Sequence, residues 1–425
     1  MRVILALNAG SSTLKLAVYG VTGDTVSGGK TPEMVTADTL SPGETPARVT
    51  GYTLLATGLA DRIGPEGSLS LQTAEGAALP VAPGPVTSHA EAIVRGIETL
   101  RRDWPAAEVV AIGHRVVHGG AEHSAPAEIT ESLIADLERL SPLAPLHQPQ
   151  NIAGIRAAQA AFPGVPQVAV FDTAFHRSHP WVNDTFALPR ALYERGVRRY
   201  GFHGLSYDYI TGALARVAPH LHDGRVVVAH LGSGASMCAI QNGRSVASTM
   251  GFSALDGLPM GTRCGQLDPG VVLYLMQSEG MSADQVAALL YQQSGLLGLS
   301  GLSNDMRVLE ASATPEAAQA IDYFVFRIQR ELGGMAAAMG GIDALVFCGG
   351  IGENSRMIRA RVCERAGWMG IEIDHGRNAR NDLVISSDLA RTTVMVMPTV
   401  EAEVIVRAAL TLLEARRRQA RSTRH

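Results

Sequence analysis

Runs of β-branched and apolar residues alternate with amphipathic stretches along most of the chain. Between many of these runs, apolar residues recur every three or four positions, which is typical of helices that turn one face toward a core. Because strands and helices alternate in this way, the pattern predicts an α/β fold. The runs that predict strands lie at residues 3–7, 14–21, 109–112, 168–171, 226–231, 344–347 and 392–397.

Local signals indicate where several helices begin. Pro149 is expected to open a helix that runs to Ala161, and Ser282 with Gln285 has the pattern of a capping box. Thr314, followed by proline, is expected to begin a long helix. The predicted core-facing side of that helix carries Ile321, Phe324, Val325 and Ile328.

Two glycine-containing hairpins recur about 220 residues apart. In the first, VILAL ends in the turn NAGSST and returns as LKLAVYGV; in the second, VVVAHL ends in GSGAS and returns as MCAIQNG before RSVAST. This recurrence predicts an internal duplication, with two similar α/β domains facing a central cleft and the two turns as phosphate-holding tips. We place the domains at residues 1–174 plus 402–425 and at 175–401.

Composition narrows the classes of function. At 425 residues, with 46% apolar and 18% charged residues, the chain is expected to form at least two folded domains. The 36 Lys and Arg residues against 40 Asp and Glu residues give no excess of positive charge, so we expect neither a nucleic acid nor a membrane as partner. The apolar start of the chain is too short for a secretory signal, and no stretch is long enough to span a membrane. With only four cysteines and no CxxC pair, the sequence favours a reducing cytoplasm.

Three polar glycine-rich turns are candidates for anion binding. The first, Asn8 to Lys15, offers backbone N–H groups, hydroxyls and one ammonium group, although a plain polar hairpin turn explains it equally well. It is no Walker A loop, because the chain returns as a strand. The turn GSGAS is the second. The third, CGGIGENS, follows a strand and is expected to open a helix near Asn354, where a nucleotide could approach the backbone; an ordinary tight connection is the alternative.

Four further side chains are placed where they could act in chemistry. Arg115 and Asp172 each follow a predicted strand, where an ion pair or a turn cap is the simpler interpretation. His203 and Arg263 each lie between glycines, which favours a functional role over packing in a helix. The sequence contains no HExxH, GxSxG or GxGxxG pattern, which argues against zinc hydrolases, serine hydrolases and Rossmann oxidoreductases.

Taken together, these segments resemble the acetate kinase family, within the actin, Hsp70 and sugar kinase superfamily. The matching segments, in chain order, are NAGSSTLK, GHRVVHGG, LAPLHQPQN, VFDTAFH, RRYGFHG, HLGSGAS, MGTRCG, GLSNDMR and GGIGENS. The resemblance extends from residue 2 to about residue 405 and implies two duplicated actin-like (ribonuclease H-like) domains in a homodimer, with the C-terminal domain binding the nucleotide and forming the dimer interface. It also implies reversible transfer of the γ-phosphoryl group of ATP to acetate, giving acetyl phosphate and ADP.

The resemblance assigns roles to particular residues. It implies that Asn8 and Glu401 position Mg²⁺, for which Mn²⁺ could substitute, and that Arg115 binds the carboxylate or its phosphate. Asp172 matches the family's proton donor or acceptor, and His203 and Arg263 match the groups that stabilise the transition state. The remaining acceptor-site matches are Val117, Leu146, His147 and Phe202. The nucleotide-site matches are Lys15, His230, Leu231, Gly232, Ser233, Gly234, Asp305, Met306, Arg307, Gly350, Ile351, Gly352, Glu353 and Asn354.

Three positions depart from the family pattern. Ser233 stands where the family has an amide, so one phosphate contact is expected to be lost or bridged by water. Ala254 replaces a proline of the acetate pocket, which could make that pocket roomier; we still expect acetate to be preferred over propionate. In the segment PTVEAE the metal ligand is expected to be Glu401, with Glu403 as the alternative.

Three other functions are alternatives to acetate kinase. A kinase for propionate or another short-chain carboxylate would use the same machinery. An ATPase switch like actin or Hsp70 would have no use for the acceptor-site residues, and a sugar kinase would need a polar pocket where Val117, Leu146 and Phe202 offer an apolar one.

Overall fold

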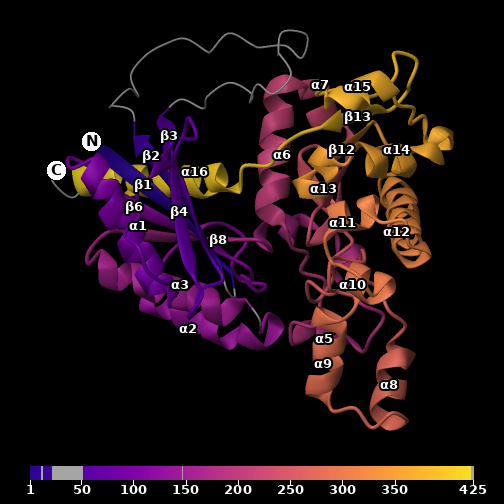
Figure 1. Cartoon of the computed structure of the whole chain (residues 1–425), viewed down its shortest axis with the longest axis horizontal. Coiled ribbons are helices and arrows are strands. Elements are labelled where there is room, and N and C mark those ends of the chain that lie inside the picture. Colours follow the sequence, from indigo (N-terminus) through magenta and orange to yellow (C-terminus); the bar gives the residue numbers. More distant parts are fainter. Residues whose placement is uncertain (11–12, 22–50, 146, 423–425) are drawn as a thin grey trace. The chain divides into compact units, whose positions relative to one another are not determined.

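The computed structural model describes residues 1–10, 13–21, 51–145 and 147–422 (Figure 1). The described residues up to Ala174, together with those from Val400 onward, form one compact unit, here called the N-terminal unit. Phe175–Thr399 form a second, the C-terminal unit. The units therefore divide after residues 174 and 399, where the sequence placed domain boundaries after 174 and 401.

In the N-terminal unit, eight strands of the described residues form one sheet in the order β5-β4-β3-β2-β1-β6-β8-β7. β1 pairs antiparallel with β2 and parallel with β6, which in turn pairs parallel with β8. The strands are β1 (Arg2–Ala9), β2 (Leu14–Val21), β3 (Tyr52–Asp61), β4 (Ser68–Thr73), β5 (Ala78–Leu79), β6 (Glu108–Val116), β7 (Ala127–Glu128) and β8 (Gln167–Phe171).

Successive side chains along each strand point to opposite faces of this sheet, so every second residue shares a face. Leu5 and Leu7 of β1 and Ile112 of β6 join the core cluster that includes residues of α1 and α3. The intervening residues point to the opposite face. On that face α16 packs so closely that a Cβ on Gly113 would lie 2.2 Å from the side chain of Ile405. The helices of this unit are α1 (His89–Asp103), α2 (Glu131–Arg139), η2 (Ser141–Leu143), α3 (Gln148–Ala161) and α16 (Glu401–Ser422).

In the C-terminal unit, five strands form a sheet in the order β11-β10-β9-β12-β13. The strands are β9 (Arg225–Leu231), β10 (Ala235–Gln241), β11 (Arg244–Ser248), β12 (Ala344–Cys348) and β13 (Thr393–Val396). Two antiparallel pairings are followed by two parallel ones. β3-β2-β1-β6-β8 of the N-terminal unit have the same order and directions. The predicted duplication and α/β class are therefore confirmed in both sheets.

The long helix α12 (Pro315–Met339) packs against this second sheet with the face that the sequence predicted, because Phe324 and Ile328 are fully buried. Ser282 and Gln285 form the predicted capping box at the start of α9. The other helices of this unit are α4 (Trp181–Asp184), α5 (Arg190–Glu194), α6 (Gly204–Val217), α7 (Pro219–His222), α8 (Pro269–Gln277), α9 (Ala283–Gln292), α10 (Gly295–Ser300), α11 (Met306–Ala311), α13 (Gly349–Asn354), α14 (Arg356–Glu364), η4 (Gly367–Met369) and α15 (His375–Arg380). A short turn of helix, η3 (Ala174–Ser178), includes the last residue of the N-terminal unit.

The glycine-rich turn after β12 was expected to open a helix near Asn354, and α14 begins two residues further on, at Arg356. The sequence did not predict that the turn itself forms a short helix, α13, from Gly349 to Asn354. Glycines are poor helix formers, yet here the Glu353 carboxylate accepts a hydrogen bond from the N–H of Gly349 and closes the first turn. Among the described helices, none is long and apolar enough to cross a membrane.

Candidate active site

The N-terminal unit brings four of the predicted residues into one polar chain. Arg115, at the end of β6, donates from Nε to Asp172 Oδ1 over 2.9 Å and from Nη2 to Oδ2 over 2.6 Å. Its remaining Nη1 donates to Asn8 Oδ1 over 3.1 Å, and Asn8 Nδ2 lies 3.5 Å from Glu401 Oε2. We call Asn8, Arg115, Asp172 and Glu401 the arginine–carboxylate cluster. It forms because Asn8 and Arg115 lie on the sheet face that α16 covers.

Burial and charge oppose each other at Arg115. Burial alone would lower its pKa, but the Asp172 and Glu401 carboxylates outweigh that effect and hold the pKa above its ordinary value. The guanidinium therefore stays charged throughout the range in which enzymes work. Its side chain keeps a fifth of its surface exposed, whereas Asp172 is almost fully buried. An anion that reached this point would thus meet a fixed cation backed by a buried carboxylate.

The other predicted residues of this unit lie on β2, after β6 and at the start of α3. Lys15 is exposed on β2 directly opposite Asn8 in the β1–β2 pairing, so their side chains are neighbours on one face. Val117 follows Arg115 and is buried. His147 is half-buried at the start of α3. Leu146 lies outside the described residues.

The C-terminal unit brings His203 and Arg263 together at the turn between β9 and β10. A Cβ placed on Gly234 would lie 2.9 Å from Arg263 Nη2 and 3.2 Å from His203 Nε2. The guanidinium and the imidazole therefore converge on this glycine. Arg263 Nη1 also donates to the carbonyl of Ala254 over 2.7 Å. We call these residues the His203–Arg263 cluster.

His203 is held in an unusual backbone conformation. It caps α6 with φ +58° and ψ +25°, the left-handed region that residues other than glycine seldom adopt. Its Nδ1 lies 2.8 Å from Ser236 Oγ, and its ring stacks on His230 with centroids 4.4 Å apart. Phe202, the preceding residue, is buried. Strain of this kind is typical of functional sites.

The glycine-rich turns that follow β9 and β12 lie side by side. β9 and β12 are parallel neighbours in which His230 pairs with Cys348, so the turns that follow them emerge together. A Cβ on Gly232 would lie 3.7 Å from the backbone nitrogen of Gly350. Gly349 has φ +75°, and a Cβ there would meet the carbonyl oxygen of Leu231 at 2.8 Å. The turns therefore present closely spaced backbone to the same place.

The remaining candidates for nucleotide binding differ in what they can offer. Asp305 caps α11 and holds the largely exposed Arg307, whose N–H and guanidinium both donate to its carboxylate. Leu231 and Met306 are buried, so only their backbone could face a ligand. Ser233 is exposed, and its carbonyl accepts a hydrogen bond from Gly261. In α13, Gly352 is buried, Ile351 and Glu353 are half-buried, and Asn354 is exposed; burial raises the pKa of the Glu353 carboxyl.

Comparison with known proteins identifies the family. The sequence model of the Acetokinase family matches residues 3–407. This chain belongs to the acetokinase family. The resemblance found in the motifs is thereby confirmed.

Relatives in this family are similar over nearly the whole chain. An acetate kinase from Methylocella silvestris is 55% identical over 97% of this chain and 98% of its own length, and one from Nitrobacter hamburgensis is 48% identical over 97% and 96%. The structure of a propionate kinase from Francisella tularensis superimposes with a TM-score of 0.84 at 34% identity, covering 97% of this chain and all of that one. An acetate kinase from Porphyromonas gingivalis gives 0.81 at 36% identity with the same coverage. The predicted enzyme class, a kinase acting on acetate, is confirmed by these comparisons.

Sequence reasoning missed residues that hold the acetokinase motifs in place. Ala254 was noted only as a missing proline, yet its carbonyl anchors Arg263. Asn151 accepts a hydrogen bond from Val117 N–H and donates to the carbonyl of Ala9, which ties the end of β1 to the segment after Arg115. Asn151 stands in the motif LAPLHQPQN, and its position three residues into a helix start was the available signal.

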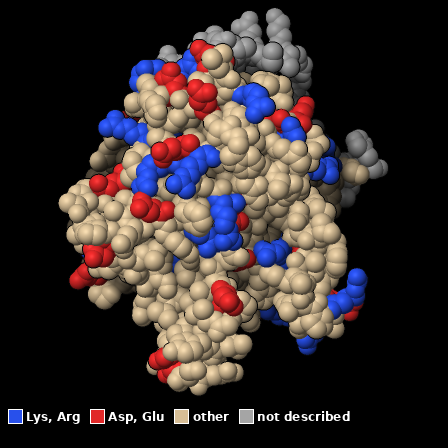
Figure 2. Space-filling model, turned by 90° about the vertical axis from the view of Figure 1, so that its right-hand side faces the viewer, with Lys and Arg blue, Asp and Glu red and all other residues tan. Residues whose placement is uncertain are grey.

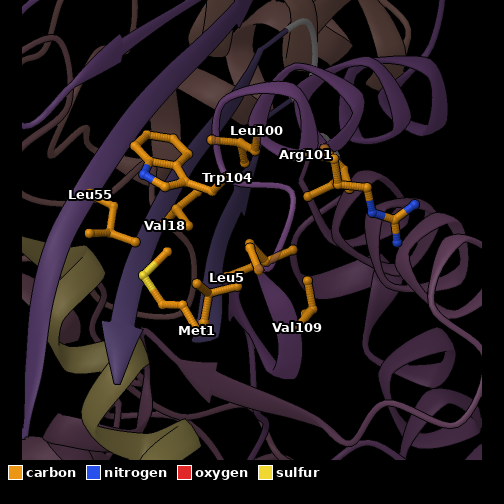
Figure 3. A pocket seen from close by; sticks show the side chains of 11 residues that line it. Met1, Leu5, Val18, Leu55, Leu100, Arg101, Trp104 and Val109 are labelled. Atoms are coloured by element: carbon orange, nitrogen blue, oxygen red, sulfur yellow. The ribbon is translucent and has the colours of Figure 1, made fainter. Parts of the chain in front are cut away.

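Two hollows elsewhere in the structure hold none of the motif residues. Figure 3 shows a cavity of about 20 Å³ among Leu5, Val18, Leu55, Leu100 and Trp104, with the guanidinium of Arg101 pointing away from it. An apolar space of that size has room for a single water and belongs to the core packing. A wider hollow of about 660 Å³ is bordered by α14, α15 and residues 389–391.

Proposed function

We propose that this acetokinase transfers the γ-phosphoryl group of ATP to acetate, reversibly, by direct in-line displacement. Phosphoryl transfer asks a protein mainly to position the reactants and to neutralise charge on the transferred group. The observation that carries the proposal is the arginine–carboxylate cluster, because a charged, partly exposed guanidinium backed by a buried aspartate suits a carboxylate acceptor. A switch that only hydrolyses ATP has no need of it.

The acceptor is held by the N-terminal unit in this proposal. Arg115 binds the carboxylate of acetate, or the phosphate of acetyl phosphate, with the part of its fork that remains accessible. The buried Val117, two residues after Arg115, offers apolar surface for the methyl group, and His147 supports the acceptor. A carboxylate is already ionised at pH 7, so Asp172 has no proton to remove and serves to orient Arg115.

The nucleotide is held by the C-terminal unit. Backbone N–H groups of the adjoining turns, at residues His230 to Gly234 and Gly350 to Asn354, donate hydrogen bonds to the phosphates, and Asp305 with Arg307 faces the nucleoside. His203 Nε2 and Arg263 stabilise the charge that develops on the transferred group. We further propose a cytoplasmic location, because none of the four cysteines forms a disulfide, which fits a reducing compartment.

The donor set also fits Mg²⁺. No group of three or more His, Cys, Asp or Glu side chains in the described residues is arranged to hold a metal by itself. Mg²⁺ does not need one, because it commonly takes one or two protein oxygens with waters and substrate phosphates. Glu401 and Asn8, whose Nδ2 lies 3.5 Å from Glu401 Oε2, are neighbours that would provide such oxygens. When bound, the ion would neutralise phosphate charge.

The contact with Asn8 favours Glu401 over Glu403 as the metal residue, and a matched pair of variants tests this. Glu401→Gln should raise the Mg²⁺ concentration for half-maximal activity about tenfold or more, since a charged ligand is lost. Glu403→Gln should leave it within about twofold of the wild type. The assignment fails if the two variants behave alike in a Mg²⁺ titration.

A homodimer is proposed from the apolar surface of the C-terminal unit. Large apolar side chains that are 38–55% exposed lie on α8, on α12, on the helices α10 and α11 that pack against α12, and in the loop between α10 and α11. They are Val271, Leu273, Tyr274, Met276, Leu299, Leu302, Val308, Tyr323 and Phe326. Charged residues are sparse toward the bottom of Figure 2, where α8 and α9 lie. Such a patch marks an interaction site.

The dimer has its own test. Leu273→Glu combined with Tyr274→Glu should halve the mass measured by light scattering after gel filtration. Leu389→Glu, which changes a leucine that is 89% exposed elsewhere, should leave the mass unchanged. A wild-type protein that is monomeric at micromolar concentration would contradict this part of the proposal.

The function itself is tested in the reverse direction. Purified protein with Mg²⁺, ADP and acetyl phosphate should form ATP. Arg115→Ala should raise the KM for acetyl phosphate at least tenfold while leaving the KM for ADP within about twofold, because a buried charged hydrogen bond to the acceptor is lost. An equal effect on both substrates would remove Arg115 from the acceptor site.

A further inference from the structure

A buried histidine outside the assigned roles contacts the backbone carbonyl of Phe202, the residue before His203. His176, in η3, has no exposed surface. Its Nε2 lies 2.9 Å from the carbonyl oxygen of Phe202, and its Nδ1 lies 2.8 Å from Ser245 Oγ. The sequence showed His176 only as the last residue of the motif VFDTAFH.

The hydrogen bonds fix the tautomer of this ring. Burial lowers the pKa of His176 to about 4, so the ring is neutral near pH 7 and carries one proton. A carbonyl can only accept, so that proton is on Nε2 and is donated to Phe202. Nδ1 must then accept, and the Ser245 hydroxyl donates its proton to it.

A second histidine completes the arrangement behind Ser245. Once Ser245 has donated its proton to His176, its oxygen can only accept from His179 Nε2, which lies 2.8 Å away. Burial lowers the pKa of His179 to about 2, so this ring is also neutral and holds its proton on Nε2. Its Nδ1 is buried without a hydrogen-bond partner, which is tolerable because this nitrogen is then an acceptor rather than a stranded donor. The protons thus point in one direction, from His179 through Ser245 to His176 and on to Phe202.

The chain ends on the peptide that sets the orientation of His203. The Phe202 carbonyl belongs to the peptide bond whose nitrogen is that of His203, and His203 is held at φ +58°. The ring of His176 also packs against Gly201, where a Cβ would lie 2.5 Å from the ring carbon Cδ2. From the other side, Ser236 contacts His203 Nδ1, and Tyr207 Oη contacts Ser236 Oγ at 2.5 Å.

We infer that His176, with Ser245 and His179 behind it, is a positioning residue that holds the Phe202–His203 peptide so that His203 Nε2 points to the glycine turn beside Arg263. A non-glycine residue is strained in the left-handed region, so the loop needs a fixed contact to stay there. The hydrogen bond from His176 supplies it. This inference rests on the role of His203 in the proposed function.

A double-mutant cycle tests the inference. Gln places its amide nitrogen near the position of Nε2 and can still donate to Phe202, whereas Asn reaches only the Nδ1 side. His176→Asn should lower kcat about 10- to 100-fold with little change in the KM for ATP, because small displacements of catalytic groups cost that much. His176→Gln should recover most of the loss, and the exposed His375→Asn should change nothing.

The second arm of the cycle separates positioning from general stability. In a His203→Ala background, His176→Asn should reduce kcat by less than about twofold, because no imidazole remains to be positioned. A loss of equal size in both backgrounds, or a Gln variant as slow as the Asn variant, overturns the inference. If the Asn variant fails to fold, Ser245→Ala is the replacement, with a smaller kcat loss that likewise vanishes without His203.

NMR of the His203 ring tests the positioning role without measuring turnover, so its outcome is independent of the test of the proposed function. Nitrogen-15 NMR of the His203 ring in nucleotide-free protein should show shifted resonances in His176→Asn and wild-type resonances in His176→Gln. Unchanged His203 resonances in both variants would overturn the inference even in an active enzyme. If the wild type makes no acetyl phosphate, the proposed function fails, and the NMR comparison still decides whether His176 holds His203.

Discussion

At the scale of single residues, the structure explains how Arg263 is aimed. One arm of its guanidinium is held by the carbonyl of Ala254, and the other lies beside Gly234, within reach of the same turn as His203. A side chain anchored in this way can stabilise charge on a transferred phosphoryl group without being ordered anew in each cycle. We therefore treat Arg263 as an arginine finger supplied by the chain itself.

Removing this guanidinium should greatly lower the turnover rate. Arg263→Ala should lower kcat about a thousandfold or more, in line with other arginine fingers, and change the melting temperature little. Steady-state kinetics with saturating ATP and acetate measure the effect. Arg365→Ala, at an exposed arginine after α14, is the control and should retain wild-type turnover. Near-normal turnover in Arg263→Ala would contradict the assignment.

The sequence could indicate which candidate side chains lie close together, but not the contacts that hold them. Arg115 and Asp172 each ended a predicted strand, and parallel pairing of β6 with β8 brings them together. The supports of Arg263 and His203 are a backbone carbonyl and a histidine 27 positions before His203 in the chain. Backbone groups look alike in every sequence, and a contact between distant segments has no local pattern, so neither could be found from the motif.

At the scale of elements, the two glycines that begin α13 differ in whether the fold requires them. Gly349 has φ +75° and no room for a Cβ beside the Leu231 carbonyl, so it is required by the fold. Gly350 has no atom within 4 Å of a Cβ position and an ordinary φ, so the fold does not require it. We propose that its lack of a side chain serves a ligand that approaches the backbone.

A pair of alanine variants should separate an effect on stability from an effect on nucleotide binding. Gly349→Ala should lower the unfolding free energy by about 1 to 3 kcal/mol, because it adds strain and a backbone clash. Gly350→Ala should leave the melting temperature unchanged but weaken MgADP binding at least tenfold in calorimetric titration. Wild-type affinity in Gly350→Ala would show that the turn does not hold phosphate.

The start of α13 also shows a limit of reading elements from sequence. Three glycines in six residues argue against a helix by intrinsic preference. Tertiary contacts decide otherwise, since Glu353 closes the turn and also accepts a hydrogen bond from Thr399 N–H, far along the chain. Strands with a continuous apolar pattern, such as β1 and β9, were predicted well. The outer strands β3 and β4 were missed, because polar residues and glycine interrupt their apolar pattern.

At the scale of the whole molecule, buried neutral histidines make stability depend on pH. Burial lowers the pKa of His114 and His176 to about 4 and that of His179 to about 2, against an ordinary value of 6.5. Between pH 6.5 and about 4, these imidazoles therefore bind protons in the unfolded chain but stay neutral in the folded chain. Stability is full above pH 6.5 and falls as the pH is lowered through that window.

Each of these imidazoles should cost about 1.4 kcal/mol of unfolding free energy per pH unit within the window. Scanning calorimetry at pH 7.5 and pH 5.5 should show melting temperatures that are lower at the acid pH. His176→Gln, which has no imidazole to protonate, should show a shallower decline. Equal melting temperatures at the two pH values would contradict the assignment of these rings as neutral and buried.

The organisation of the chain was the most predictable feature at this scale. Two hairpins about 220 residues apart indicated a duplication, and both sheets show it in strand order and direction. Periodicity and turn chemistry are local, so a repeated unit leaves them in the sequence twice. The six outward-facing apolar residues of α8, α10 and α11 did not stand out, since exposed and buried apolar positions read the same until the fold is known.

The central claim is that the chain phosphorylates acetate, and trapping the product tests it most directly. Purified protein is incubated with MgATP, acetate and hydroxylamine, which converts acyl phosphates to coloured hydroxamates, beside reactions with propionate, with butyrate and without acid. We predict strong acetohydroxamate formation that equals the ADP formed, less product with propionate, and little phosphate release without acid. ATP hydrolysis at the same rate without any acid, with no hydroxamate, would contradict the account.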